Sequence, residues 1–208
     1  MTQIAATRGL IAALEAIAAD APAHGLTLNE VLERLGDRAF GVAMFAVTLP
    51  SFIPIMAQIV SIPMLLLAGQ MAAGRNEPWL PARHGVQRIE KASLVQMARN
   101  ARRWLGWMER LARPRYQRFT GLWGQRVCGV LFIVFAISIL IPLLFTNGVP
   151  ATGILIASLG LFMSDGVLVV IGLTIGTVWI ALLVTALAIG GPAAIEAIIG
   201  FALQLFGR

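Results

Sequence analysis

Charged side chains are scarce in this 208-residue chain. Only 12% of its residues are Asp, Glu, Lys or Arg, whereas 58% are hydrophobic, and the mean hydropathy is +0.83. A water-soluble domain carries about 25% charged residues, so this chain has too little charge to cover a soluble surface. The composition predicts an integral membrane protein and excludes a large soluble enzyme domain.

Cysteine, histidine and lysine are also rare. The single Cys128 lies in an apolar run, so no intramolecular disulfide is expected. His24 and His84 are isolated in hydrophilic stretches, which indicates neither a metal site nor a nucleophile with its base. Lys91 follows no glycine-rich loop, which excludes a common type of phosphate site. We therefore expect no enzyme activity, no metal and no cofactor.

The few charges are unevenly placed. Residues 1–38 carry three arginines against five acidic residues, whereas residues 74–126 carry twelve Lys and Arg against three glutamates. Short basic loops stay on the cytoplasmic side of the membrane, so the sequence predicts that segment 74–126 lies in the cytoplasm. Because topology explains these basic residues, no nucleic-acid partner is expected.

Hydropathy divides the chain into five segments. Residues 1–38 form two amphipathic helices, at 2–19 and after Thr27, whose spacing to Glu30 is that of a capping box. Residues 39–73 carry no charge, and Pro50, Pro54 and Pro63 divide them into arms at 39–49 and 62–73 that are too short to span a bilayer. A re-entrant hairpin or two tilted helices would satisfy this pattern.

The remaining three segments are a linker, a second hairpin and a C-terminal region. Residues 74–126 form a basic linker whose arginine-rich helix has one apolar stripe and is expected in the headgroup region. Residues 127–164 form a second hairpin, broken at Pro142, at Asn147 and at Pro150. Residues 165–208 contain a clean transmembrane helix at 167–189 and a C-terminal helix after Pro192. The predicted class is all-α, a polytopic membrane protein with two proline-broken hairpins, one clean span and interfacial amphipathic helices.

The two hairpins resemble each other in sequence. An offset of 88 places five residues of the first half on identical residues of the second, and the central breaks also match. Paired interrupted hydrophobic segments predict an internal repeat with a site at the repeat interface. A parallel and an inverted arrangement both remain open, although a linker without a span favours the parallel one. The identities are Gly36, Arg38, Gly41, Val42 and Pro54 with Gly124, Arg126, Gly129, Val130 and Pro142.

Two groups of polar residues are candidates for a site. Arg38 and Arg126, related by the offset, could together bind a phosphate or an anionic headgroup, or could simply snorkel at the membrane boundary. Asp37, Asp165 and Asn147 could couple to an ion or a proton. Asp165 could equally cap the helix that follows it, and Asn147 could merely satisfy backbone at the hairpin tip.

A glycine pair in the clean span is a candidate for helix packing. Gly172 and Gly176 are one helical turn apart, and small residues at this spacing let two helices approach closely. This face could form a homodimer or pack against the chain's own hairpins.

The chain resembles the ExoD family of exopolysaccharide synthesis proteins, bacterial inner-membrane proteins. The likeness covers roughly residues 26–190. It departs from the family pattern at Ser51, at Gln58 and at Gln125, where an acidic residue often precedes the arginine. The residues that carry it are Leu35 to Gly41, Leu49, Pro50, Pro54, Trp79, Pro81, Arg126, Gly129, Pro142, Asn147, Pro150, Leu159, Gly160, Asp165 and Gly166.

The resemblance implies a role in exopolysaccharide production and, in some rhizobia, in host invasion and alkaline tolerance. The leading hypothesis is a non-enzymatic membrane protein, a homodimer, that contacts membrane lipid and supports exopolysaccharide machinery. A small ion- or proton-coupled transporter is the first alternative. The second alternative is a protein that binds a lipid-linked sugar phosphate through Arg38 and Arg126.

Overall fold

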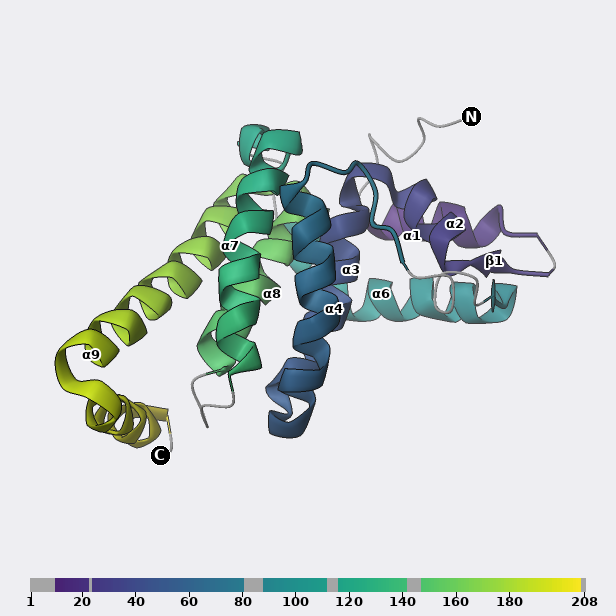
Figure 1. Ribbon diagram of the computed structural model, residues 1–208. Coiled ribbons are helices and arrows are strands. Elements are labelled where there is room, and N and C mark those ends of the chain that lie inside the picture. The colour runs from purple at the N-terminus through teal and green to yellow at the C-terminus, as the bar shows by residue number, and fades with distance from the viewer. Residues whose placement is uncertain (1–9, 23, 81–87, 112–115, 142–146, 207–208) are drawn as a thin grey trace.

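The computed structural model describes residues 10–22, 24–80, 88–111, 116–141 and 147–206, and most of them are helical (Figure 1). A two-residue antiparallel pair, in which Leu26 faces Ile89, is the exception to the predicted all-α class. The elements in chain order are α1 (Leu10–Ala19), β1 (Leu26–Thr27), α2 (Leu28–Leu35), η1 (Gly36–Arg38), α3 (Ala39–Thr48), η2 (Leu49–Phe52), α4 (Pro54–Ala72), β2 (Arg88–Ile89), α6 (Lys91–Leu111), η3 (Gln117–Phe119), α7 (Leu122–Leu140), α8 (Gly148–Met163) and α9 (Gly166–Phe206).

The predicted capping box at the start of α2 is confirmed. The Thr27 hydroxyl accepts from the Glu30 N–H at 3.2 Å, and the Glu30 carboxylate accepts from the Thr27 N–H at 2.6 Å. Hydrogen bonds to an ionised carboxylate favour that form. The backbone hydrogen bond from Thr27, helped by the bond from the Thr27 hydroxyl, therefore lowers the pKa of Glu30.

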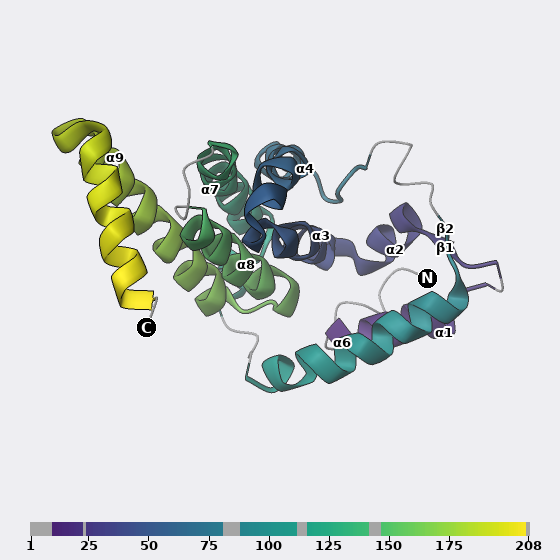
Figure 2. The ribbon, with the colours of Figure 1, turned by 90° about the horizontal axis from the view of Figure 1, so that it is seen from below.

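The helices α1, α2 and α6 lie together at one side of the molecule, with α1 and α6 side by side (Figure 2). Lys91 donates from Nζ to the carbonyl oxygens of Ala19 at 3.3 Å and Ala21 at 2.8 Å. Arg102 pairs with Glu15 at 3.1 Å, and Leu94 and Ala98 are buried. Part of the apolar stripe of α6, the helix predicted to lie among lipid headgroups, is therefore buried against α1. Met97, an apolar residue of the same helix, is exposed.

The first hairpin consists of α3, η2 and α4. The break predicted near Pro50 is present as η2, and Pro54 stands at the first position of α4, where its missing N–H costs nothing. The break predicted at Pro63 is wrong, because α4 continues through Pro63. One interior proline removes a single backbone hydrogen bond, and here it lies on the exposed side of the helix beside Ile62.

The second hairpin consists of α7 and α8. The first of these helices begins at Leu122, five residues before the predicted start of the hairpin at 127, and it therefore includes Gln125 and Arg126. Pro150 lies in the first turn of α8, where proline is tolerated, so it does not break the helix as predicted. The predicted break at Pro142 lies outside the described residues.

In the packing of the two hairpins, the first helix of each contacts the second helix of the other: α3 packs against α8, and α4 packs against α7. Glycine makes both contacts close. A Cβ on Gly41 would lie 2.6 Å from the Phe162 nitrogen and 2.9 Å from the Ser158 oxygen, and a Cβ on Gly129 would lie 2.8 Å from the Ala68 oxygen. The core between the hairpins is apolar, and its largest buried side chains include Phe40, Phe132, Phe135, Met44 and Met64.

The long helix α9 packs against α8 with its first half and then leaves the bundle (Figure 1). Gly191, with φ of 58°, kinks it where the sequence predicts a turn. Among the described residues, two helical stretches are long and apolar enough to cross a membrane, Gly166–Gly191 and Leu122–Leu140. The sequence predicted only one clean span. The second was missed because Arg126 was assigned to the linker rather than to the first turns of α7.

Candidate functional site

Most of the predicted site residues lie at one end of the bundle. The start of α3 and the end of α8 meet there at Gly41 and Phe162, and the start of α7 meets the end of α4 at Gly129 and Ala68. The helix α9 begins at the same end, directly after α8. Asp37, Arg38, Arg126 and Asp165 therefore belong to this end. Asn147 begins α8 at the other end, about 24 Å away for a helix of 16 residues.

Asp37 and Gln125, which the offset of 88 relates, are in direct contact. The Gln125 side chain is buried and donates from Nε2 to the Asp37 carbonyl oxygen at 3.1 Å, and to the Thr120 oxygen at 3.4 Å. Asp37 itself is exposed. Its backbone, rather than its carboxylate, thus makes the link between the two hairpins. The amide of Gln125 supplies the N–H donor that this link requires.

Arg126 lies against the C-terminal end of α4. Gly74 follows that helix with φ of 75°, and a Cβ at Gly74 would collide with the Arg126 guanidinium. The C-terminal end of a helix carries partial negative charge and favours a cation. The position therefore gives Arg126 a structural role at this helix end, and its exposed side chain is also open to an external anion.

Asp165 is buried and caps α9. Its Oδ1 accepts from the Val167 N–H at 3.0 Å, and its carbonyl accepts from the Val169 N–H at 3.3 Å. This is the hydrogen-bonding pattern of an N-cap residue. Asn147, at the far end of α8, accepts through its backbone oxygen from the Ala151 N–H at 3.1 Å. The structure separates these two residues by the whole of α8, so they do not form one ion site.

The glycine pair of α9 packs within the chain. A Cβ on Gly172 would lie 2.5 Å from the Gly153 oxygen of α8, and a Cβ on Gly176 would meet the ring of Phe135 in α7. Both glycines are buried. Of the two alternatives, the glycine pair therefore packs against the chain's own hairpin, and it is not available to a second copy of the chain.

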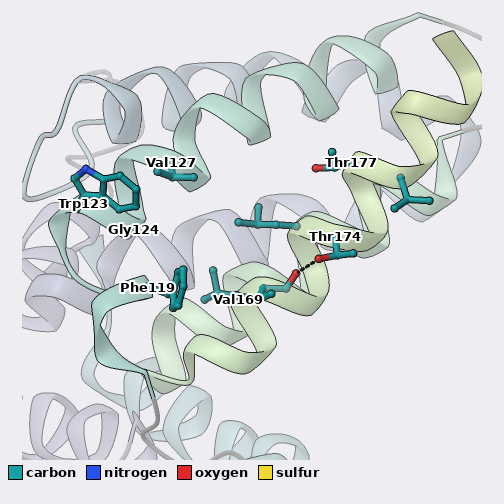
Figure 3. Close-up of a pocket in the computed structure, with 10 residues that line it drawn as sticks. Phe119, Trp123, Gly124, Val127, Val169, Thr174 and Thr177 are labelled. Atoms are coloured by element: carbon teal, nitrogen blue, oxygen red, sulfur yellow. Dashed lines mark hydrogen bonds between the residues drawn. The ribbon is translucent and has the colours of Figure 1, made fainter. Parts of the chain in front are cut away.

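A groove between α7, α9 and η3 was not predicted from the sequence. It has a volume of about 290 Å³ and an almost wholly apolar lining (Figure 3). The α7 wall comes from Trp123, Gly124 and Val127, and the α9 wall includes Val169, Leu173 and Val178, with Phe119 at one end. Its residues come from segments about 50 positions apart, so no local pattern could have revealed it. Within the described ranges no group of three or more His, Cys, Asp or Glu is placed to hold a metal ion.

Comparison with known proteins gives a family. The profile of the family described as "Exopolysaccharide synthesis, ExoD" matches residues 10–185. An uncharacterized protein of Synechocystis sp. is 32% identical over 152 residues, 70% of this chain and 72% of that protein. Protein ExoD of Rhizobium meliloti is 29% identical over 192 residues, 85% of this chain and 78% of that protein. No solved structure matches significantly.

The family match extends from α1 into the second half of the α9 span. It thus includes both hairpins, the basic linker and the end of the bundle at which Arg38, Arg126 and Asp165 lie. The chain belongs to the ExoD family of exopolysaccharide synthesis proteins.

Proposed function

We propose that this protein is a multi-pass protein of the bacterial inner membrane that supports exopolysaccharide synthesis or export without catalysing a reaction of its own. The family supports the process, and the outer surface of α9 supports the location. Within Gly166–Gly191, an 18-residue stretch has a mean hydropathy of 2.7, yet only 22% of that stretch is buried in the protein. An exposed apolar surface of this length requires a cover, and a bilayer provides one.

The charge of the linker supports the proposed orientation. The linker and the starts of α3, α7 and α9 share one end of the bundle. Short basic segments stay on the cytoplasmic side, so this end is proposed to face the cytoplasm. The span in α9 then carries the chain to the periplasmic side at Gly191. The C-terminal stretch after the kink would lie at that outer surface.

The two hairpins are proposed to be parallel repeats that both enter from the cytoplasm. Two observations support this. Gly41 contacts α8 in the same way as Gly129 contacts α4. In both cases the nearest backbone atoms of the partner helix are a carbonyl oxygen and the nitrogen four residues after it. The equivalent residues Asp37 and Gln125 touch, as residues beside a two-fold axis must.

The first hairpin is further proposed to be re-entrant. Its tip exposes apolar side chains, with Leu49 at 49% and Ile53 at 58%. Its polar groups bond internally, because the Thr48 hydroxyl donates to the Met44 oxygen at 2.7 Å and the Ser51 hydroxyl to the Thr48 oxygen at 2.6 Å. A tip of this kind needs no water and is suited to the hydrocarbon layer.

Cysteine labelling tests the membrane arrangement. The native Cys128 is buried and is replaced by Ala. Single cysteines are then introduced at the exposed residues Arg99, Phe52 and Ala193. In cells with a permeabilised outer membrane, an impermeant maleimide should label A193C directly, R99C only after lysis, and F52C in neither case. Labelling of R99C from outside would overturn the orientation, and labelling of F52C would overturn the re-entrant tip.

The biological role is tested by deletion. Removing the gene should lower the exopolysaccharide secreted per cell, and the wild-type chain should restore it. An unchanged amount would refute the role.

The partners proposed are membrane lipid, the exopolysaccharide machinery and a second copy of the chain. Because Gly172 and Gly176 are occupied within the chain, a homodimer would use another surface, such as the outer face of α9 at Val184.

A further inference from the structure

We infer that the groove between α7 and α9 binds one hydrocarbon chain of an anionic phospholipid, with the lipid phosphate at Arg118. The inference rests on the proposed membrane location. It assigns a lipid site on the side of α7 that carries Trp123 and Val127, away from the Arg126–Gly74 contact with α4.

The walls of the groove suit a hydrocarbon chain. The lining includes no ionisable side chain. The Thr174 hydroxyl donates to the Val170 oxygen at 2.8 Å, so its hydrogen bond is made within α9 (Figure 3). A groove with an almost wholly apolar lining offers few hydrogen-bond partners to a peptide backbone and favours an apolar occupant.

One end of the groove suits a headgroup. Phe119 and Trp123 lie at this end and are 39% and 67% exposed (Figure 3). Tryptophan is enriched at the level of lipid headgroups because its ring is apolar and its N–H is polar. The groove therefore has a deep apolar part between the helices and an aromatic end at the proposed cytoplasmic surface.

An exposed cation stands beside that end. Arg118 is exposed and directly precedes Phe119 in η3. The chain has no Asp or Glu between Glu109 and Asp165, and Asp165 is buried as the cap of α9. An arginine pairs well with a phosphate, and a basic residue near the membrane surface favours an anionic lipid about fivefold.

Fluorescence quenching by brominated lipids tests the site. The four other tryptophans are changed to Phe so that Trp123 alone reports. The protein is reconstituted in phosphatidylcholine brominated on its acyl chains, and unbrominated phosphatidylglycerol or phosphatidylcholine is added as the competitor. We expect phosphatidylglycerol to relieve the quenching of Trp123 about fivefold more effectively. Equal competition would overturn the inference.

Variants assign the effect to the groove. Arg118→Gln should bring the preference close to one, whereas Arg99→Gln, an exposed arginine of α6, should leave it unchanged. Thr174→Phe should fill the groove and reduce the quenching of Trp123 by the brominated phosphatidylcholine. Because Arg118 lies at the surface, its substitution should leave the fold intact. A preference that survives Arg118→Gln would refute the assigned phosphate position.

A second reporter separates this inference from the proposed function. A variant that keeps only Trp179, in the middle of the α9 span, should be quenched by brominated phosphatidylcholine without headgroup preference. Absence of that quenching would refute the membrane location itself. If the brominated phosphatidylcholine quenches Trp179 but not Trp123, a second copy of the chain covers the groove, which also refutes the lipid site.

Discussion

Gly129 is the position at which a single methyl group should most clearly disturb the packing of the two hairpins. A Cβ there would lie 2.8 Å from both the Ala68 oxygen and the Met71 Cβ of α4. Real Cβ atoms do not approach a backbone oxygen so closely, so Gly129→Ala must push α4 and α7 apart. Overpacking of this kind costs about 1–3 kcal/mol.

Gly69→Ala is the matched control. Gly69 lies inside α4, and a Cβ there would meet nothing within 4 Å. Both substitutions gain the same helix propensity, roughly 1 kcal/mol, so the difference between the two variants measures the packing alone. For a chain of this size 1 kcal/mol corresponds to about 2–4 °C in Tm. The Tm of Gly129→Ala should therefore fall roughly 2–12 °C below that of Gly69→Ala.

Thermal unfolding in detergent, followed by intrinsic tryptophan fluorescence, measures this difference. Gly41→Ala should cause a loss similar to that of Gly129→Ala, because its Cβ would meet α8 in the same way. Equal Tm values for Gly129→Ala and Gly69→Ala would refute the close approach of α4 and α7. A normal Tm for Gly41→Ala beside a low Tm for Gly129→Ala would instead contradict the equivalence of the two hairpins.

Three further predictions concern the helix ends. Asp165→Ala should cost about 0.5–2 kcal/mol in the same unfolding assay, whereas Asp165→Asn, which keeps an accepting oxygen, should cost much less; equal losses would contradict the capping role. Because the folded pKa of Glu30 is lowered, its contribution to stability is present above its ordinary pKa of 4.5 and is lost as the pH falls through the folded value. The drop in Tm on acidification should thus be smaller in Glu30→Gln than in the wild type. Gly74→Ala should lower the Tm through its positive φ and its collision with Arg126, and adding Arg126→Ala should restore part of the loss; no restoration would refute the contact.

Local signals in the sequence predicted local structure well. Thr27 and Glu30 predicted the capping box because all its partners lie within four residues. The glycines at 190 and 191 predicted the kink of α9 because backbone conformation is decided at the residue itself. The break predicted at Pro63 was wrong because a proline predicts only the loss of one backbone hydrogen bond. Whether the helix ends there is decided by the surrounding packing.

Packing between distant segments could not be read from the sequence. The spacing of Gly172 and Gly176 indicated a close helix contact, but only the fold shows that Gly153 and Phe135 provide it. Likewise the offset of 88 related Asp37 to Gln125 without showing that they touch. The groove was invisible because its two walls come from α7 and α9, and neither wall carries a motif.

The anchoring of α6 onto α1 gives the basic segment a fixed shape. Lys91 closes the end of α1, Arg102 pairs with Glu15, and Leu94 is buried between the two helices. A partner that binds this segment would therefore meet a preformed array of arginines rather than a loose tail that must first be ordered. Such a surface can discriminate between partners by the spacing of their negative charges, at little entropic cost.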